Sequence, residues 1–398
     1  MLQLNPQTAH IQDPSHRLTA DERITFGAEA AARVPLYLRH AEGPQAPFET
    51  PLRALPGLAD ALGLSAVHVK DESPRLGLGS FKALGGAYAV ARLVLEAAEP
   101  RLGRPLAAAD LWTAPVRAIA ETLTFTCATD GNHGRSVAYG AAQVGARAVI
   151  FVHPGVSAPR RAAMAAFGAT ITEVPGSYDD SVAAAARMAA ARGWILVSDT
   201  AWPEPGRVPT LVMQGYGALA REVVDALDAP PTHLFIQAGV GGIAAALAAY
   251  FAGAYGPASP RCIVVEPDRA ACLAASATAG RAVEVAPGAP TVMAMLECYA
   301  PSLTAFDLLS RLATGFMTVS DEEDIAALRR LADPLRGDPA IVAGESGAAG
   351  LAGLLQAAAD PEARAALGLN AGSRVLLVAT EGATDPERYA ALLHPGPA

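Results

Sequence analysis

The run SFKALGG, residues 80–86, carries the residue on which the assignment of the fold depends, Lys82. Phe81 precedes this lysine, and Ala83, Leu84 and two glycines follow it. Apolar neighbours favour the uncharged amine, which is the form that condenses with a carbonyl group. Most single lysines are nevertheless surface side chains with a buried stem. How strongly Lys82 indicates a reactive amine therefore depends on the runs that follow it along the chain.

A polar turn, TDGNHG, occupies residues 129–134. It brings Asp130, Asn132 and His133 into one loop, so that a carboxylate, an amide and an imidazole lie together. A helix is predicted directly after this turn, over residues 135–142. A helix-capping turn of polar residues, without any ligand, is the alternative interpretation.

A glycine run, GVGG, occupies residues 239–242 and joins a predicted strand at 234–236 to a predicted helix that reaches about Phe251. Glycines let the backbone approach a ligand closely, and the N–H groups at the start of a helix attract anions. The run is therefore typical of a phosphate-binding turn, although a tight turn without a ligand is the alternative. Its extended form, GVGGIA, lacks the GxGxxG spacing of dinucleotide-binding turns.

Apolar strands alternate with amphipathic helices along most of the sequence, which indicates mostly parallel sheets covered on both faces. A capping box from Ser320 to Glu323 begins one of the later helices. The segment from Pro100 to Arg117, rich in proline and arginine, is predicted to be an irregular insertion. The predicted strands cover residues 148–152, 170–174, 195–197, 234–236, 262–265 and 375–378, and further helices cover 157–168 and 179–192.

Several residues occupy the positions where ligands bind in parallel α/β sheets, just beyond the carboxyl ends of the strands. Ordinary loops begin there too, so the position alone is weak evidence. The residues are Asp199, Gly239, Glu266 and Thr380.

The composition and charge of the chain limit the kinds of partner that it can bind. The chain has 398 residues, of which 52% are hydrophobic, which suits two to three domains with a large core. The formal net charge of −9 disfavours binding to nucleic acid or to an anionic membrane. The N-terminus lacks the basic and apolar regions of a secretory signal. The uncharged segment 234–260 is rich in glycine and alanine, so a buried strand, turn and helix explain it better than a membrane span.

The cysteines show no spacing that predicts a metal site. Reduced, buried thiols in a cytoplasmic protein are the expected state, and a disulfide between Cys272 and Cys298 is the less favoured alternative. The chain has four cysteines: Cys127, Cys262, Cys272 and Cys298.

In the order SFK…GG, GNHG and GVGG, the three runs resemble those of the fold type II pyridoxal-phosphate (PLP) enzymes. That group includes serine and threonine dehydratases, threonine synthase and the tryptophan synthase β chain. A closer resemblance is to the diaminopropionate ammonia-lyases, and Asp130 ahead of GNHG together with SDTAW (198–202) is its most specific part. Similar runs extend over nearly the whole chain: KDESPRLGLGSFKALGGAY (70–88), ATDGNHGRSVAY (128–139), PGSYDD (175–180), SDTAW, MQGYG (213–217), QAGVGG (237–242), VEPDRAACL (265–273), GESGAAG (344–350) and ATEGATDPE (379–387).

The resemblance implies a fold of two three-layer α/β domains with mostly parallel sheets, and PLP in the cleft between them. Residues 1–84 and 206–398 would form the larger domain, and residues 85–205 the smaller. Lys82 would form a Schiff base with the cofactor, Asn132 would bind its phenolic oxygen, and Thr380 would be a neutral partner of its pyridine nitrogen. The implied cofactor-binding residues are Lys82, Phe81, Asn132, Gly239, Val240, Gly241, Gly242 and Thr380.

The implied reaction is the α,β-elimination of 2,3-diaminopropionate to an aminoacrylate, which hydrolyses to pyruvate, with release of two molecules of ammonia. Asp130 and Asp199 suit a substrate with a second ammonium group, and together with Lys82 they are the predicted catalytic residues. Lys82 would serve the L-isomer, and Asp130 the D-isomer. The family also implies a homodimer.

Some positions depart from the family's pattern. Ala379 stands where serine is usual, which leaves open which of two neighbouring residues contacts the pyridine nitrogen. Gly79-Ser80 and Ala383 differ as well and bear on substrate preference. Two alternatives stay open: a lyase of the serine/threonine dehydratase type, whose substrate has no need of Asp130, and a PLP-fold binding protein without catalytic activity.

Overall fold

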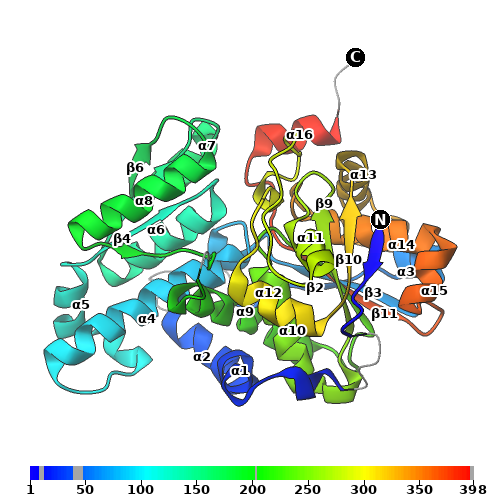
Figure 1. Ribbon diagram of the computed structural model, residues 1–398, viewed down its shortest axis with the longest axis horizontal. Helices are drawn as coiled ribbons and strands as arrows, with labels where there is room; N and C mark the ends of the chain where they lie inside the picture. Colours follow the sequence, from blue (N-terminus) through cyan, green and yellow to red (C-terminus); the bar gives the residue numbers. More distant parts are fainter. Residues whose placement is uncertain (9–12, 39–47, 202–203, 395–398) are drawn as a thin grey trace.

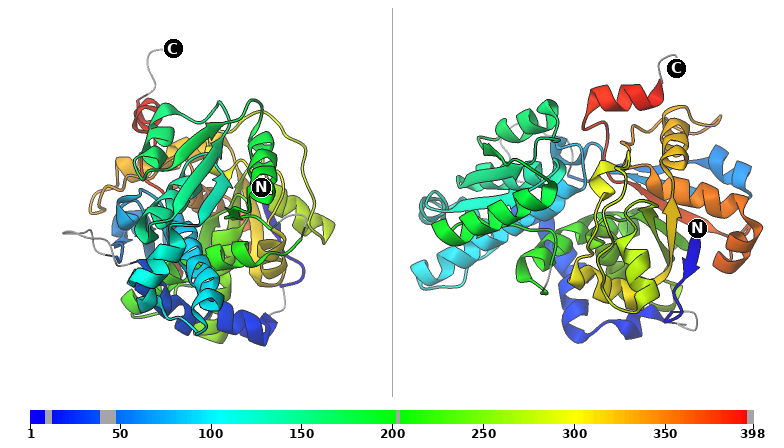
Figure 2. Two further views of the ribbon diagram at one scale, coloured as in Figure 1. Left: turned by 90° about the vertical axis from the view of Figure 1, so that its left-hand side faces the viewer. Right: turned by 45° about the horizontal axis from the view of Figure 1, so that its top comes forward.

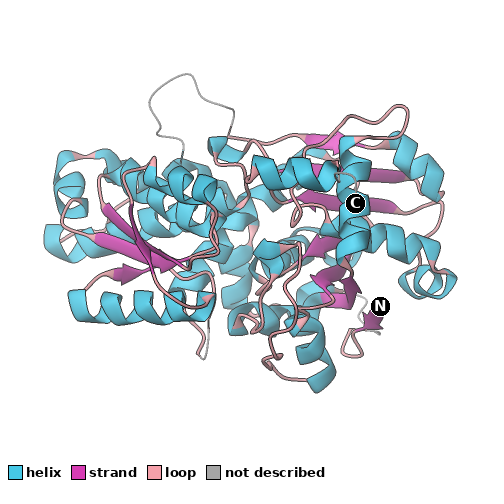
Figure 3. Ribbon diagram, turned by 90° about the horizontal axis from the view of Figure 1, so that it is seen from above, coloured by secondary structure: helices cyan, strands magenta, loops and turns pink. Residues whose placement is uncertain are grey.

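The computed structural model describes residues 1–8, 13–38, 48–201 and 204–394. It consists of two lobes side by side, each built around its own sheet with helices on both faces (Figures 1 and 3). The smaller lobe contains a four-stranded sheet, and the larger lobe contains a seven-stranded sheet. The smaller sheet falls within residues 85–205 and the larger sheet outside them, while the exact domain boundaries stay a prediction.

The larger sheet is parallel except at its two edges. The edge strands β1 and β2 pair antiparallel with their neighbours. All five residues of β8 are buried, as expected for a strand covered on both faces. In sheet order, the strands are β1 (Leu2–Leu4), β10 (Ala313–Val319), β9 (Arg261–Pro267), β8 (His233–Gln237), β11 (Arg374–Ala379), β3 (Ala66–Asp71) and β2 (Leu52–Ala54).

The smaller sheet is parallel throughout. Its central strand β4 lies between β5 and β7, so the loops that follow these three strands lie at one edge of the sheet. In sheet order, the strands are β6 (Thr170–Glu173), β5 (Arg147–Val152), β4 (Thr124–Ala128) and β7 (Ile195–Leu196).

Helices cover both sheets, as Figure 2 shows from two further directions. They are α1 (Ala20–Phe26), α2 (Ala28–Leu38), α3 (Pro56–Leu62), α4 (Lys82–Leu102), α5 (Ala114–Ala120), α6 (Asn132–Val144), α7 (Ala158–Ala165), α8 (Tyr178–Arg192), α9 (Arg207–Ala226), α10 (Gly242–Tyr255), α11 (Cys272–Ala279), α12 (Leu303–Leu312), α13 (Asp321–Ala332), α14 (Ala349–Ala359), α15 (Pro361–Leu367) and α16 (Pro386–Leu393). Short 3-10 turns are η1 (Pro14–Arg17), η2 (Arg75–Gly77), η3 (Ala108–Trp112), η4 (Gly256–Ala258) and η5 (Ala294–Leu296).

Helix α4 connects the lobes, because it packs against α6 of the smaller lobe and against α9. The packing is close where glycines remove side chains from the contact. A Cβ at Gly140 of α6 would lie 2.7 Å from Cα of Ala87. A Cβ at Gly85 would lie 2.6 Å from the Tyr216 ring of α9. Lys82 is the first residue of this helix and is thereby held at the junction of the two lobes.

The predicted elements appear with small shifts of their ends, and the capping box of Ser320 and Glu323 is present. The prediction of an irregular insertion from Pro100 to Arg117 is wrong. Helix α4 continues through Pro100, and η3 and α5 follow. Pro100 lies inside α4, and Pro115, at the second position of α5, favours a helix start.

A buried network of charges ties α9 to the segment that precedes Lys82. Arg75 is fully buried, and its guanidinium donates to Glu72 (2.8 Å) and to Glu222 of α9 (2.7 Å). Lys70 also donates to Glu222 and to the carbonyl of Thr50, both at 2.5 Å. Buried charges need such mutual partners, because an unpaired one is strongly destabilising.

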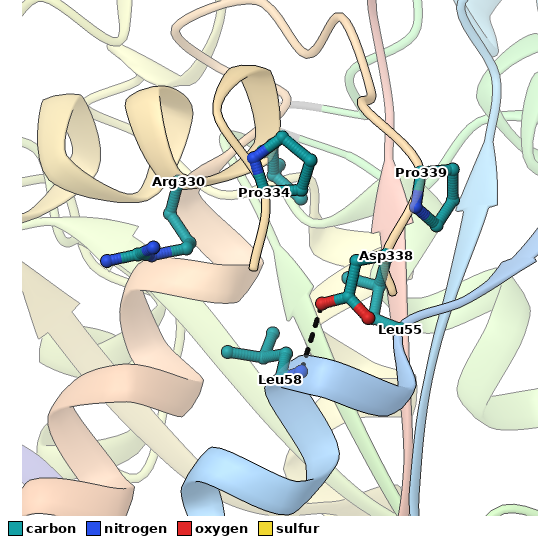
Figure 4. Close-up of a pocket in the computed structure, with 7 residues that line it drawn as sticks. Leu55, Leu58, Arg330, Pro334, Asp338 and Pro339 are labelled. Carbon is teal, nitrogen blue, oxygen red and sulfur yellow. Dashed lines mark hydrogen bonds between the residues drawn. The ribbon is translucent and has the colours of Figure 1, made fainter. Parts of the chain in front are cut away.

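The first turn of α3 is capped from far along the chain. Asp338 accepts hydrogen bonds from the backbone N–H groups of Gly57 (2.6 Å) and Leu58 (2.9 Å), as Figure 4 shows for Leu58. The cavity beside this cap has a volume of about 10 Å³, enough for about one water molecule. The cap is therefore a structural feature and no binding site.

Within the part of the chain that the structure describes, no helix is long and apolar enough to cross a membrane. The same residues hold no group of three or more His, Cys, Asp or Glu that could bind a metal ion. All four cysteines are free thiols. Cys272 and Cys298 both lie beside Gly239, but they do not form a disulfide in this structure.

Candidate active site

The predicted site residues come from the carboxyl ends of strands in both sheets. Asp130 and Asp199 follow β4 and β7, which are neighbouring parallel strands of the smaller lobe. Gly239 and Thr380 follow β8 and β11, which are neighbours in the larger lobe. A bridge between Ser80 and the residue after Thr380 brings the start of α4 to the same place.

Lys82 and Asp199 form an ion pair at this junction. The Lys82 ammonium donates to Oδ2 of Asp199, and the two side chains are only 20% and 17% exposed. Burial opposes the charge on Lys82, but the carboxylate of Asp199 raises the pKa of the amine above its ordinary value. Burial likewise opposes the charge on Asp199, yet Lys82 brings the pKa of that carboxyl well below its usual range. The expectation of a neutral amine, drawn from the apolar neighbours in the sequence, is therefore wrong for this structure.

No other lysine competes with Lys82 at this site. The chain contains only two lysines, and the other one is Lys70. Lys70 is buried and bound to Glu222 and to the Thr50 carbonyl. Lys82 is consequently the one lysine that lies at the site.

His133 lies behind the ion pair, and its protonation follows from its contacts. Its Nε2 lies 2.7 Å from the carbonyl oxygen of Val197, which only accepts, so Nε2 carries the hydrogen. Its Nδ1 is buried, has no hydrogen-bond partner among the described residues and lies 3.9 Å from Oδ2 of Asp199. Burial lowers the pKa of His133, so the ring is neutral with a free lone pair on the side of Asp199.

Asp130 is paired with a residue that the sequence did not suggest. Oδ1 of Asp130 lies 2.8 Å from Nε2 of His153, in the loop after β5. No motif marked His153, because the pair arises only when β4 and β5 lie side by side.

The charges of the predicted catalytic residues act on two further side chains, Cys298 and Tyr178. Burial raises the pKa of the Cys298 thiol to about 12, and the charges of Asp199, Lys82 and Asp130 all act on it. The pKa of Tyr178 is raised well above its usual range by desolvation of its hydroxyl and by Asp199 and Asp130, although 36% of the residue remains exposed. Tyr178 belongs to the PGSYDD run, but the sequence did not predict a role for it.

The glycine run forms a tight turn between β8 and α10. Gly241 has φ of +98°, and a Cβ there would lie 3.2 Å from side chains of Leu273 and Ala305. A Cβ at Gly239 would lie 2.8 Å from Sγ of Cys298. Since the first turn of a helix leaves backbone N–H groups without partners inside the helix, the start of α10 suits a phosphate group.

The side chains of Thr380 and Asn132 form hydrogen bonds with other residues of the protein. The Thr380 hydroxyl accepts from Nε2 of Gln237 (3.0 Å) and donates to the Ser346 carbonyl (3.3 Å). Asn132 donates through its amide to Glu381, a residue that the sequence did not single out. Burial raises the pKa of Glu381 to about 7, and the charge of Glu345 adds to this effect.

These residues suit PLP in their chemistry. Lys82 would offer an amine to its aldehyde, and the turn at 239–242 would offer space and N–H groups to its phosphate. The Tyr216 hydroxyl is buried without a partner among the described residues, and the Tyr216 ring packs 4.8 Å from that of Phe81. A polar ligand in this space would satisfy that hydroxyl.

A cavity of about 360 Å³ lies next to the site. Its lining includes Gly79 and Gly382, which flank Ser80 and Glu381, and also Arg135 of α6. Trp202, the last residue of the predicted SDTAW motif, lies outside the described residues.

Comparisons with known proteins agree with this geometry. The family model "Pyridoxal-phosphate dependent enzyme" matches residues 44–381. The chain is 39% identical to diaminopropionate ammonia-lyase of Escherichia coli (strain K12) over 350 residues, which are 85% of this chain and 86% of that protein. It is 38% identical to the enzyme of that name from Salmonella typhimurium (strain LT2), with the same coverage of both chains.

Among solved structures, the chain is similar to that of the Escherichia coli diaminopropionate ammonia-lyase in complex with an aminoacrylate-PLP azomethine reaction intermediate. The TM-score is 0.85 at 34% identity, over 99% of this chain and 96% of that one. Threonine deaminase isoform 2 from Solanum lycopersicum, at a TM-score of 0.74 and 20% identity, shares the fold.

Proposed function

The chain belongs to the diaminopropionate ammonia-lyases, a family of pyridoxal-phosphate-dependent enzymes, and on this premise we propose that Lys82, Asp130 and Asp199 carry out the family's reaction. The reaction is the α,β-elimination of 2,3-diaminopropionate, which gives pyruvate and two molecules of ammonia. The observation that carries the proposal is one lysine with two carboxylates at a single site, where the second amine of the substrate needs an anionic partner.

PLP, when bound, withdraws electrons from the α-carbon of the substrate and so makes its proton removable. Lys82 would hold the aldehyde carbon, Asn132 would contact the phenolic oxygen, and Thr380 would face the pyridine nitrogen. Thr380 is a neutral partner that Gln237 orients, so it does not promote protonation of the ring nitrogen. The residues proposed to hold the cofactor are Lys82, Phe81, Asn132, Gly239, Val240, Gly241, Gly242 and Thr380.

The two carboxylates have separate tasks. Asp199 has a pKa well below its usual range, so it stays ionised and paired with Lys82 instead of donating a proton. Asp130 attracts the second ammonium group of the substrate. Lys82 takes the α-proton of the L-isomer, and Asp130 takes that of the D-isomer from the opposite face. The β-nitrogen, bound as an ammonium group, takes the electrons of its bond to carbon and leaves as ammonia, so it needs no further proton.

The test is pyruvate formation by the purified holoenzyme from D- and L-diaminopropionate and from serine, measured for the wild type and Asp130→Asn. We expect diaminopropionate to react faster than serine. Asp130→Asn should lower D-isomer turnover by about a hundredfold and L-isomer turnover much less, because only one isomer loses its base. Asp179→Asn, an exposed change on α8, is the matched control.

Three results would contradict the proposal. Equal losses of both isomers in Asp130→Asn would mean that Asp130 is no stereospecific base. Faster turnover of serine than of diaminopropionate would favour a dehydratase. No pyruvate from either substrate, with PLP bound, would favour a binding protein.

We also propose that the enzyme is a cytoplasmic homodimer. Four free cysteines suit a reducing compartment. Light scattering after size-exclusion chromatography should give about twice the 40.6 kDa of one chain, and a mass of one chain would refute the dimer.

A further inference from the structure

We propose that His153 is a positioning residue for Asp130: it holds one oxygen of this carboxylate so that the other is directed at the second ammonium group of the substrate. This inference rests on the proposed role of Asp130 in binding a diamine. It adds a residue that no sequence motif contains and makes recognition of the diamine depend on a histidine.

The sheet itself builds the pair. In the register of the parallel strands β4 and β5, Ala128 lies opposite Phe151. Asp130 and His153 each lie two residues beyond these partners, so the two chains leave the sheet side by side. Nε2 of His153 then lies 2.8 Å from Oδ1 of Asp130.

A second contact fixes which nitrogen carries the hydrogen. The backbone N–H of Gly155 donates to Nδ1 of His153 at 3.1 Å. A backbone N–H can only donate, so Nδ1 is the acceptor, and Nε2 carries the hydrogen that it gives to Asp130. The turn is tight, because a Cβ at Gly155 would lie 2.6 Å from Cε1 of the ring. The imidazole is therefore held at both nitrogens and can orient the carboxylate.

The free oxygen of Asp130 is available to a ligand. Oδ2 has no hydrogen bond to any residue that the structure describes, and the side chain is 30% exposed. Asp199 already has Lys82 as its partner, so Asp130 is the carboxylate with an oxygen to spare for a second cation.

The pair also makes recognition of the diamine depend on pH. The carboxylates whose charge acts on His153 are Asp130 itself and Glu297, which follows η5 in the larger lobe. The hydrogen bond to Asp130 raises the pKa of His153 above its ordinary value of 6.5, against the opposing effect of burial. Below that pKa the imidazolium neutralises the charge of Asp130 and competes with the substrate ammonium for it. The KM for the diamine should therefore rise as the pH falls through the pKa of His153.

The experiment compares kcat and KM of three holoenzymes, wild type, His153→Gln and His153→Leu, for both isomers of diaminopropionate across the pH range. A glutamine amide can donate from the place of Nε2 but does not titrate, whereas leucine cannot donate. His153→Leu should raise the KM of the D-isomer by about tenfold with a smaller change in kcat. His153→Gln should stay within about twofold of the wild type near neutral pH and lose the rise of KM at low pH. The amines of the substrate titrate equally in all three reactions, so the difference between profiles belongs to His153.

His16→Gln is the matched control, because His16 lies 3.5 Å from Asp13 in a surface pair that is 80% exposed on the histidine side. Its profile should equal that of the wild type.

Equal KM increases in both His153 variants at every pH would overturn the inference, since a merely structural histidine would behave in this way. If His153→Leu does not fold, the profile of His153→Gln still decides, and a retained rise of KM at low pH would refute it. Unchanged diamine kinetics in Asp130→Asn would instead refute the proposed function. If Asp130→Asn is impaired but both His153 variants have unchanged kinetics, only the role of His153 is refuted.

Discussion

Lys82 is a buried lysine that keeps its positive charge. Burial lowers the pKa of its amine, but the carboxylate of Asp199 raises it by more, so the amine stays protonated. The amine can attack a carbonyl carbon only after it has lost this proton, so the proposed role of Lys82 requires deprotonation of the ion pair. The other lysine of the chain, Lys70, is held by Glu222 and by the Thr50 carbonyl.

The scarcity of lysine makes the attachment site directly testable. Borohydride reduction of the holoenzyme should fix the cofactor to Lys82, and peptide mapping by mass spectrometry should find the label there. Lys82→Ala should lose the label and the visible absorbance band together, because no second amine is free at the site. Label on Lys70, or an unchanged band in the variant, would refute the assignment.

Glu381 gives a prediction for pH-dependent stability. Its pKa is raised to about 7 from an ordinary 4.5, so the folded state keeps a proton that the unfolded state has lost between these values. The resulting stabilisation is complete below about pH 4.5 and is lost as the pH rises through about 7, with a size of about 3 kcal/mol. Glu381→Gln should remove this slope from denaturation midpoints measured over that range. Glu387→Gln, on the exposed side of α16, should keep the slope; the same slope in both variants would contradict the prediction.

The sequence pointed to candidate site residues but not to their partners. Lys82, Asp130 and Asn132 were predicted because each lies in a short run of characteristic residues. His153, Tyr178 and Glu381 were not assigned roles. Asn132 and Glu381 lie 249 residues apart, and such a contact exists only once two lobes are packed. Local patterns therefore identify reactive groups, whereas the contacts that set their charge depend on the tertiary fold.

At the scale of elements, continuous apolar runs were the reliable signal. The strands β5, β8, β9 and β11 were predicted within one or two residues, because buried parallel strands are apolar on both faces. Strand β4 was missed, since its sequence, TFTCA, alternates threonine with apolar residues and its end merges into the TDGNHG turn. Helix α5 was missed because its proline was interpreted as a sign of irregular structure.

The cap of α3 gives a prediction for a single element. Asp338→Ala removes the acceptor of two backbone N–H groups and should lower the free energy of unfolding by about 1 kcal/mol. Turnover should be unchanged, because the cap lies away from the site residues. Asp268→Ala, an exposed aspartate, should change neither quantity. Chemical denaturation followed by circular dichroism measures the difference, and an equal effect of both changes would contradict the role of the cap.

At the scale of the whole molecule, the network of Lys70, Glu72, Arg75 and Glu222 joins the segment before Lys82 to α9. Glu222→Gln would leave two buried cations with one carboxylate and should lower the free energy of unfolding by about 3 kcal/mol. Glu29→Gln breaks an exposed pair with Arg33 and should cost less than about 1 kcal/mol. Denaturant titration of the two variants tests this contrast, and similar midpoints would show that the network contributes little.

The smaller lobe enters and leaves the larger one at nearly one place, because Lys82 at the start of α4 touches Asp199 just after β7. In evolutionary terms, a segment whose ends meet can be exchanged between relatives as a cassette. Such an exchange would carry Asp130, His153 and Asp199 with the cassette and leave Lys82 and Thr380 in the recipient. Recombination at these two crossings would transfer the residues proposed to select the substrate and leave those proposed to hold the cofactor unchanged.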